Sequence, residues 1–220
     1  MKHRLALSLA CAIGLTASAN AQNSQLSQGV QVSAIEFTFG GETFEVAVPK
    51  GYCTPTGDQA AVSAQIAAGD SQNETLADLQ RCGSFGTDYM VIKTPRALPP
   101  VPLPKSVFVK MVAEQLQTTE TGDAGMTKGQ EDVAEMTGGE VSVDPTAYSY
   151  AGFDDDCAYI AGTLEVSAGE ETNIVRTGSC LTLVGTRNFS VHSYSTETGG
   201  ASVDALKTRS RDLANAITVK

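Results

Sequence analysis

The first residue type that could take part in catalysis is histidine. The chain of 220 residues holds two histidines, His3 and His192. A serine hydrolase needs an imidazole to take the proton from its nucleophile, and His192 is the candidate for that role. Alternation along Phe189-Ser-Val-His-Ser-Tyr194, however, places His192 and Tyr194 on the strand face opposite Phe189. No Gly-x-Ser-x-Gly segment supplies an exposed nucleophile. We therefore expect His192 to be a polar-face strand residue that any activity can dispense with.

Carboxylates are the second source of chemistry. The run Asp154-Asp155-Asp156, with Asp144 or Glu140 nearby in sequence, is a candidate calcium site. An EF-type loop needs acids at alternating positions around a glycine, and that spacing is absent, so we interpret the run as a solvated turn. Paired carboxylates for glycoside hydrolysis stay open because their approach is spatial, although the chain has no Trp. No nucleotide-binding motif is found, and we expect no catalytic residue, metal or cofactor.

The cysteines favour disulfides over metal or redox chemistry. Apart from Cys11 they are four in number, an even count typical of exported proteins: Cys53, Cys82, Cys157 and Cys180. No Cys-x-x-Cys spacing supports zinc or a redox pair. If Ala168-Gly169 is a two-residue turn between strands, Cys157 lies directly opposite Cys180, within disulfide reach. We expect Cys157–Cys180 and, by elimination, Cys53–Cys82.

The N-terminal segment is typical of a signal peptide. Lys2 and Arg4 precede the short apolar run 5–15, and Ala19-Asn20-Ala21 offers small residues for cleavage. The run is too short to span a membrane, and the residues before Cys11 do not favour a lipoprotein. We expect cleavage after Ala21 and a periplasmic or secreted product without a membrane span.

Composition narrows the class of protein. Hydrophobic residues make up 41% of the chain, too many for a disordered protein. Its 15 Lys+Arg against 25 Asp+Glu give a net charge of −10, which disfavours nucleic acid as a partner. We expect a disordered segment at 22–30 and a single domain over 31–220.

The pattern of elements predicts an α+β fold in which a few helices cover an antiparallel, disulfide-stapled sheet. A hairpin around Gly40-Gly41 should pair Phe37 with Phe44. A helix should begin at Gly57-Asp58 with Asp58 as N-cap and end near Gly69-Asp70. Strands are expected at 74–82, 88–94, 139–150, 156–166, 171–185 and 187–195.

Further helices and loops complete the expected domain. A Pro-rich connector should occupy 95–104. Ser106 should cap a helix whose apolar face carries Phe108, Met111, Val112 and Leu116. A mobile loop near 118–138 should hold one short helix at 127–136. A last helix is expected from Val203 to Val219, with Leu206, Ser210 and Leu213 on its inner stripe.

Several segments resemble a group of exported Gram-negative proteins for which no activity is established. The resemblance lies in Pro49-Lys-Gly-Tyr-Cys53, Asp70-Ser-Gln-Asn73, Asp88–Pro95, Asp156-Cys-Ala-Tyr159 and Gly178-Ser-Cys180. The order of strands and helices also resembles the PsbP-like α+β fold. Neither resemblance implies a catalytic residue. We expect a non-catalytic binding or envelope-accessory protein with a protein or small-molecule partner; the alternative is a small periplasmic hydrolase that uses carboxylates or His192.

Overall fold

The protein combines one large and one small antiparallel sheet with three described helices. The computed structural model describes residues 29–118, 141–144, 147–168 and 171–220. The large sheet has the strand order β3-β4-β5-β10-β9-β8-β6, and β7 also pairs with β8. Its strands are β3 (Tyr52–Cys53), β4 (Asn73–Arg81), β5 (Asp88–Pro95), β6 (Val141–Asp144), β7 (Ser149–Phe153), β8 (Ala158–Ala168), β9 (Glu171–Val184) and β10 (Arg187–Thr196).

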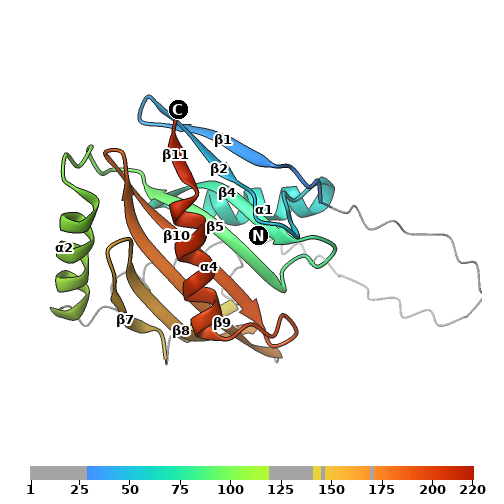
Figure 1. Cartoon of the computed structure of the whole chain (residues 1–220). Helices are drawn as coiled ribbons and strands as arrows, with labels where there is room; N and C mark the ends of the chain where they lie inside the picture. The colour runs from blue at the N-terminus through green and yellow to red at the C-terminus, as the bar shows by residue number, and fades with distance from the viewer. Residues whose placement is uncertain (1–28, 119–140, 145–146, 169–170) are drawn as a thin grey trace, which may run out of the picture.

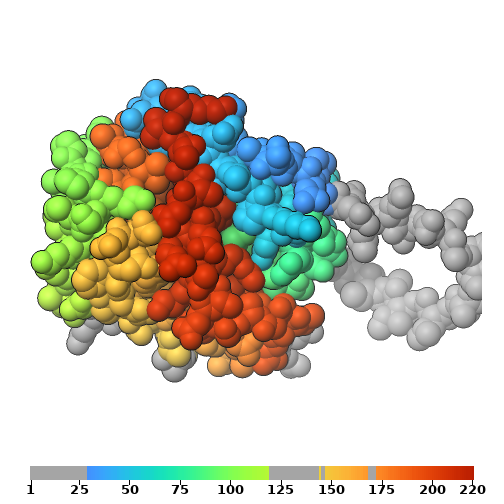
Figure 2. All heavy atoms as spheres, viewed as in Figure 1, coloured from blue at the N-terminus to red at the C-terminus, as the bar shows by residue number. Residues whose placement is uncertain are grey.

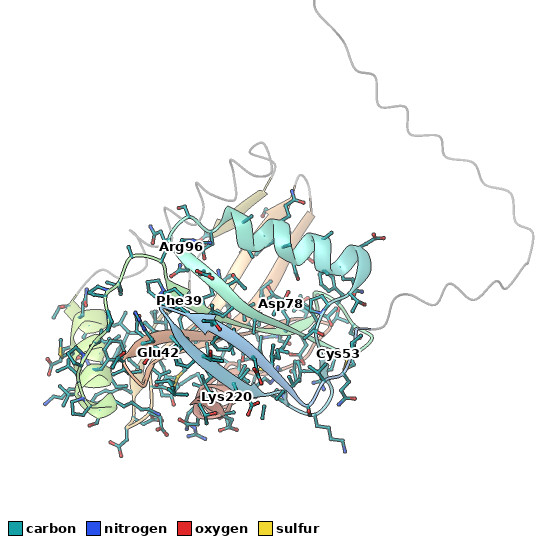
Figure 3. The ribbon with its side chains drawn as sticks, turned by 90° about the horizontal axis from the view of Figure 1, so that it is seen from above. Phe39, Glu42, Cys53, Asp78, Arg96 and Lys220 are labelled. Atoms are coloured by element: carbon teal, nitrogen blue, oxygen red, sulfur yellow. A yellow bond between two sulfur atoms is a disulfide. The ribbon has the colours of Figure 1, made fainter. Side chains whose placement is uncertain are left out.

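The small sheet and the helices lie on the two faces of the large one. The small sheet has the order β1-β2-β11, with β1 (Ala34–Phe39), β2 (Glu42–Ala47) and β11 (Ile217–Val219). Helix α4 (Val203–Asn215) crosses the face nearest the viewer in Figure 1, and the atoms of this C-terminal segment run across the same face in Figure 2. Helix α1 (Gly57–Gly69) lies on the opposite face (Figure 3), and α2 (Lys105–Thr118) stands at the far end beside β7–β9. The expected α+β class is confirmed.

The main core lies between the large sheet and the layer formed by α4 and the small sheet. The predicted hairpin is correct: Gly40 and Gly41 adopt φ values of 59° and 83°, and Phe37 pairs with Phe44. Positive φ is easily reached only by glycine, so these two residues suit the tight turn. The ring of Phe44 meets the ring of Phe189 on β10 edge to face, with 5.0 Å between centroids. The hairpin thereby covers the apolar side chains on this face of the large sheet.

Helix α4 approaches the sheet closely because two small residues face each other. A Cβ at Gly178 on β9 would lie 2.5 Å from the backbone nitrogen of Lys207. Ser210 Oγ lies 2.5 Å from the carbonyl oxygen of Gly178 and 2.9 Å from Ser193 Oγ. The predicted stripe of Leu206, Ser210 and Leu213 is buried as expected.

A buried carboxylate ties α4 to strands β3, β4 and β5 of the sheet. Asp88 at the start of β5 is 2% exposed. It accepts a hydrogen bond from Tyr52 Oη at 2.9 Å and pairs with Arg81 at 2.9 Å and with Arg209 on α4. Burial and this hydrogen bond raise the pKa of Tyr52 to about 12. The cluster joins β3, β4, β5 and α4 through charges that are costly to leave unpaired.

Two predicted helix boundaries are wrong. The last helix ends at Asn215, and Ile217–Val219 forms β11 along β2. These β-branched residues favour a strand once the free edge of β2 is available. Helix α2 begins at Lys105, so Ser106 lies inside its first turn. The carbonyl of Pro104 accepts from the backbone N–H groups of residues 107 and 108.

Three smaller expectations also need correction. Asp58 is not the N-cap of α1, because the helix begins at Gly57 and Thr56 holds the cap position. Met111 is 54% exposed, while Val109 and Ala113 are the buried residues of α2. The strand expected over 139–150 is divided between β6 and β7. The short helix expected at 127–136 and most of the loop at 118–138 lie outside the described residues.

Candidate functional site

Both expected disulfides are present. Cys53 bonds Cys82, with Cα atoms 5.2 Å apart, and Cys157 bonds Cys180, with Cα atoms 5.1 Å apart. The strand register predicted for the second pair is nevertheless wrong, because Cys180 lies opposite Tyr159 on β8. Cys157 precedes β8, where its backbone nitrogen donates to Asp154 Oδ1 and its carbonyl oxygen accepts from the Asp154 backbone nitrogen, and from this turn it reaches Cys180.

The Asp154–Asp156 run forms a structural turn. Asp154 accepts hydrogen bonds from the backbone nitrogens of Asp156 and Cys157, each at 2.9 Å, and from Tyr159 Oη at 2.6 Å. Partial burial acts against its ionisation, but these donors and the nearby charge of Arg211 hold the pKa of Asp154 below its usual value. Within the described part of the chain, no three acidic, His or Cys side chains cluster as a metal site.

His192 lies between two serine hydroxyls on the α1 side of the sheet. Its Nδ1 is 2.8 Å from Ser179 Oγ on β9, and its Nε2 is 2.9 Å from Ser190 Oγ on β10. Its ring lies nearly parallel to that of Tyr194, as expected for two residues on one strand face. Burial lowers the pKa of His192 to about 3, and the charge of Lys93 acts in the same direction.

This arrangement does not match a hydrolytic triad. Ser179 is fully buried, and hydroxyls occupy both ring nitrogens where a triad has a carboxylate on one of them. A general base works best when its pKa is near the operating pH. An imidazole with a pKa of about 3 is a weak proton acceptor. His192 therefore links β9 and β10 through its hydrogen bonds with Ser179 and Ser190.

A pocket of about 240 Å³ lies on this same face, between α1 and the strands β4, β5 and β10. Its walls are mainly apolar, with a few polar groups that converge from different elements. The lining residues that matter here are Ile66 and Ala67 on α1, Asp78 and Gln80 on β4, and Tyr89, Val91, Lys93 and Tyr194 on β5 and β10. Helix α1 has no buried side chain, so it covers the pocket without entering the core.

Asp78 is the carboxylate of this pocket, and it is held in place from two sides. Ser63 Oγ on α1 donates a short hydrogen bond to its Oδ2, and Gln80 Nε2 donates to its Oδ1 at 2.6 Å. Gln80 is fixed in turn because its Oε1 accepts from the backbone nitrogen of Gly86 at 3.0 Å. Burial raises the pKa of Asp78, and the two neutral donors offset only part of that effect. Figure 3 shows Asp78 beside α1.

Two tyrosines form the aromatic wall of the pocket. The rings of Tyr89 and Tyr194 are stacked, with 4.8 Å between centroids and an interplanar angle of 20°. Burial raises the pKa of Tyr194 to about 12 and also raises that of Tyr89. Both hydroxyls are therefore neutral at physiological pH and can donate hydrogen bonds.

The lysine of the pocket already has a partner. Lys93 Nζ lies 2.7 Å from Asp70 Oδ2 in the turn after α1. Asp70 Oδ1 also accepts from the backbone nitrogen of Asn73 at 2.8 Å. Burial opposes the ionisation of Asp70, but the hydrogen bond and charge of Lys93 keep its pKa low. The pair fixes the C-terminal end of α1 to β5.

A second, wider groove of about 570 Å³ lies between α2 and β8–β10. Its lining includes His192, Tyr148 and Leu181 together with apolar residues of α2. Burial raises the pKa of Tyr148, whose hydroxyl lies 3.3 Å from Ser179 Oγ. The groove places His192 beside apolar side chains but not beside a carboxylate that hydrogen-bonds to it within the described residues.

Sequence reasoning did not single out the residues of the pocket. Asp78 and Gln80 have the same parity on β4, as do Tyr89 and Lys93 on β5. Such alternation was the available signal for a polar face. It could not reveal that α1 would cover this face and turn it into a pocket, since the spacing of α1 against β4 depends on tertiary packing.

The match with known proteins is structural and distant, and it shows no family. No protein-family model matches the chain, and no curated protein matches it. Among solved structures, it is similar to cyanobacterial PsbP (CyanoP) from Synechocystis sp. PCC 6803, at 10% identity and a TM-score of 0.41. That similarity covers 87% of this chain and 96% of the other. No helix within the described residues is both long enough and apolar enough to cross a membrane.

Proposed function

We propose that this chain is an exported, non-catalytic binding protein that holds a small molecule in the pocket beneath α1. The observation that carries this proposal is the pocket itself: an apolar cavity with stacked tyrosines and one held carboxylate, Asp78. Ligand sites are typically concave and mainly apolar, with a small number of placed polar groups. A dry cavity of about 150 Å³ accepts benzene, so a pocket of about 240 Å³ suits a small organic molecule.

Export is supported by two independent features. The segment 1–21 has the basic, apolar and small-residue regions of a signal peptide. Two disulfides join the four cysteines beyond it, and such bonds persist mainly in oxidising compartments. The mature chain proposed here begins at Gln22 and is periplasmic or secreted.

A non-catalytic role is supported by the state of the polar groups. His192 is a weak base between two serines, and Asp78 has hydroxyl and amide neighbours but no histidine or second carboxylate among its hydrogen-bond partners in the described chain. The alternative, a small periplasmic hydrolase that uses carboxylates or His192, predicts turnover by the wild type, and this turnover falls in His192→Gln if the histidine is the base. A panel of chromogenic esters, peptides and glycosides, compared between wild type and His192→Gln, decides between the two.

Filling the pocket tests the binding proposal directly. Ala67 on α1 lines the pocket, so Ala67→Phe should occupy part of it, whereas Val62 on the same helix is 45% exposed and does not line it. The assay is native mass spectrometry of the exported protein, which detects a co-purified ligand, followed by calorimetric titration of that ligand. Ala67→Phe should reduce binding at least tenfold, and the matched control Val62→Phe should not. Equal binding by both variants would refute the location.

A further inference from the structure

The charges around the pocket are unevenly compensated. The ammonium of Lys93 is 2.7 Å from Asp70 and shares its charge with that carboxylate. Asp78, by contrast, has no Lys, Arg or His nitrogen within 4.0 Å among the described residues. Its two hydrogen-bond partners there, Ser63 and Gln80, are neutral donors. The pocket therefore contains one carboxylate that is oriented but lacks a counter-ion in the described chain.

Asp78 keeps the capacity to bind a further donor. A carboxylate offers about four lone-pair positions, and the hydroxyl of Ser63 and the amide of Gln80 use one on each oxygen. The Gly86 backbone fixes the amide of Gln80, so the carboxylate does not need to reorganise on binding. Asp78 is partly buried, and a partly buried carboxylate gains from a cationic donor, because desolvation without one is costly.

The aromatic wall favours the same kind of ligand. The stacked rings of Tyr89 and Tyr194 line the pocket together with Asp78. The face of an aromatic ring attracts a cation, and this attraction increases where water is excluded. The chain also carries a net charge of −10, which raises the local concentration of cations around it.

We propose that the pocket beneath α1 selects a small organic cation, an aryl or alkyl ammonium, with Asp78 as its counter-ion. The apolar part of the ligand would lie against Ile66 and Val91, and its ammonium group would donate to the free lone pairs of Asp78. This inference rests on the proposed function, because it names the class of ligand for the same pocket. In this proposal Asp78 selects for a positively charged ligand, and Lys93 stays paired with Asp70.

The test compares probes of one shape and different charge. Benzylammonium, benzyl alcohol and benzoate are titrated into the mature chain, and binding is followed by calorimetry and by NMR shifts of the pocket residues. The expected order is benzylammonium, benzyl alcohol, benzoate, with at least a tenfold step between the first two. Asp78→Asn should remove that step, so that within this variant benzylammonium binds no more tightly than benzyl alcohol. Asp58→Asn, an exposed charge change on α1 outside the pocket, should alter neither probe.

The outcomes separate the two levels of the proposal. If benzyl alcohol binds in the pocket as well as benzylammonium does, the cation class is wrong and the binding function stands. If benzylammonium is preferred but Asp78→Asn keeps the preference, Asp78 is not the counter-ion. If none of the three probes shifts the pocket resonances at millimolar concentration, the ligand class and the pocket are both refuted. Melting curves of each variant confirm that loss of binding is not loss of fold.

Discussion

His192 should make the folded protein lose stability under mild acidification. Burial lowers its pKa to about 3 in the folded state, whereas the imidazole of the unfolded chain titrates near its ordinary value of about 6.5. Below pH 6.5 the unfolded state binds a proton that the folded state excludes. The stability linked to this histidine is therefore fully present above pH 6.5 and is lost as the pH falls toward 3. The loss should be about 1.4 kcal/mol per pH unit in that window, or about 2 kcal/mol between pH 7 and pH 5.

The assay is urea unfolding of chain 22–220 followed by circular dichroism, with the disulfides intact, at half-unit steps of pH. His3 lies in the segment expected to be removed, so His192 is the histidine that titrates. His192→Gln is the control, because an amide can still bond Ser179 and Ser190 but takes up no proton in this range. The variant shares every carboxylate with the wild type, so the difference between the two curves isolates the imidazole. Equal slopes from pH 7 to pH 5 would refute the buried, neutral state.

Three further predictions follow from the fold. Asp88→Ala should lower the free energy of unfolding by about 1.5–3 kcal/mol, because Tyr52 and the partly exposed Arg81 and Arg209 would lose a charged hydrogen-bond partner; urea unfolding measures this, and a loss below 1 kcal/mol would contradict it. Gly178→Ala should cost more than the surface change Ala205→Gly, since its Cβ would lie 2.5 Å from the backbone of α4; thermal melting of both variants compares them. N-terminal sequencing of exported protein should begin at Gln22, and a lipid-bearing start at Cys11 would show that the signal assignment is wrong.

Local patterns predicted the local structure well. The Gly40-Gly41 turn and the alternation around it determined the β1–β2 register, since both signals lie within a few residues. The β8–β9 register was missed because the turn was placed one residue early: Ala168 pairs with Glu171. That shift moves every facing pair by two positions. The disulfide was still predicted correctly, because Cys157 reaches Cys180 from a turn outside β8.

Features that depend on tertiary packing could not be predicted from the sequence. The segment Ile217–Val219 follows the inner stripe of α4 without a break in sequence, and only the free edge of β2 converts it to a strand. His192 was correctly placed on the polar face, but its burial depends on neighbours from other strands. Asp78 lies in no recognisable sequence motif. Asp78 becomes part of a pocket because α1 packs back over β4. This packing brings Ser63, which lies 15 residues earlier in the chain, to the carboxylate.

The loose attachment of α1 has a consequence for how this protein can diversify. None of the 13 residues of Gly57–Gly69 is buried, and the segment is held near its ends by the Cys53–Cys82 disulfide and by the Asp70–Lys93 pair. Substitutions within it therefore cost the core little, although they change one wall of the pocket. If the pocket binds a ligand as proposed, substitutions in this helix can change the ligand preference while the folding of the sheet is conserved. The same segment is the natural place to build a library when the pocket is to be re-engineered.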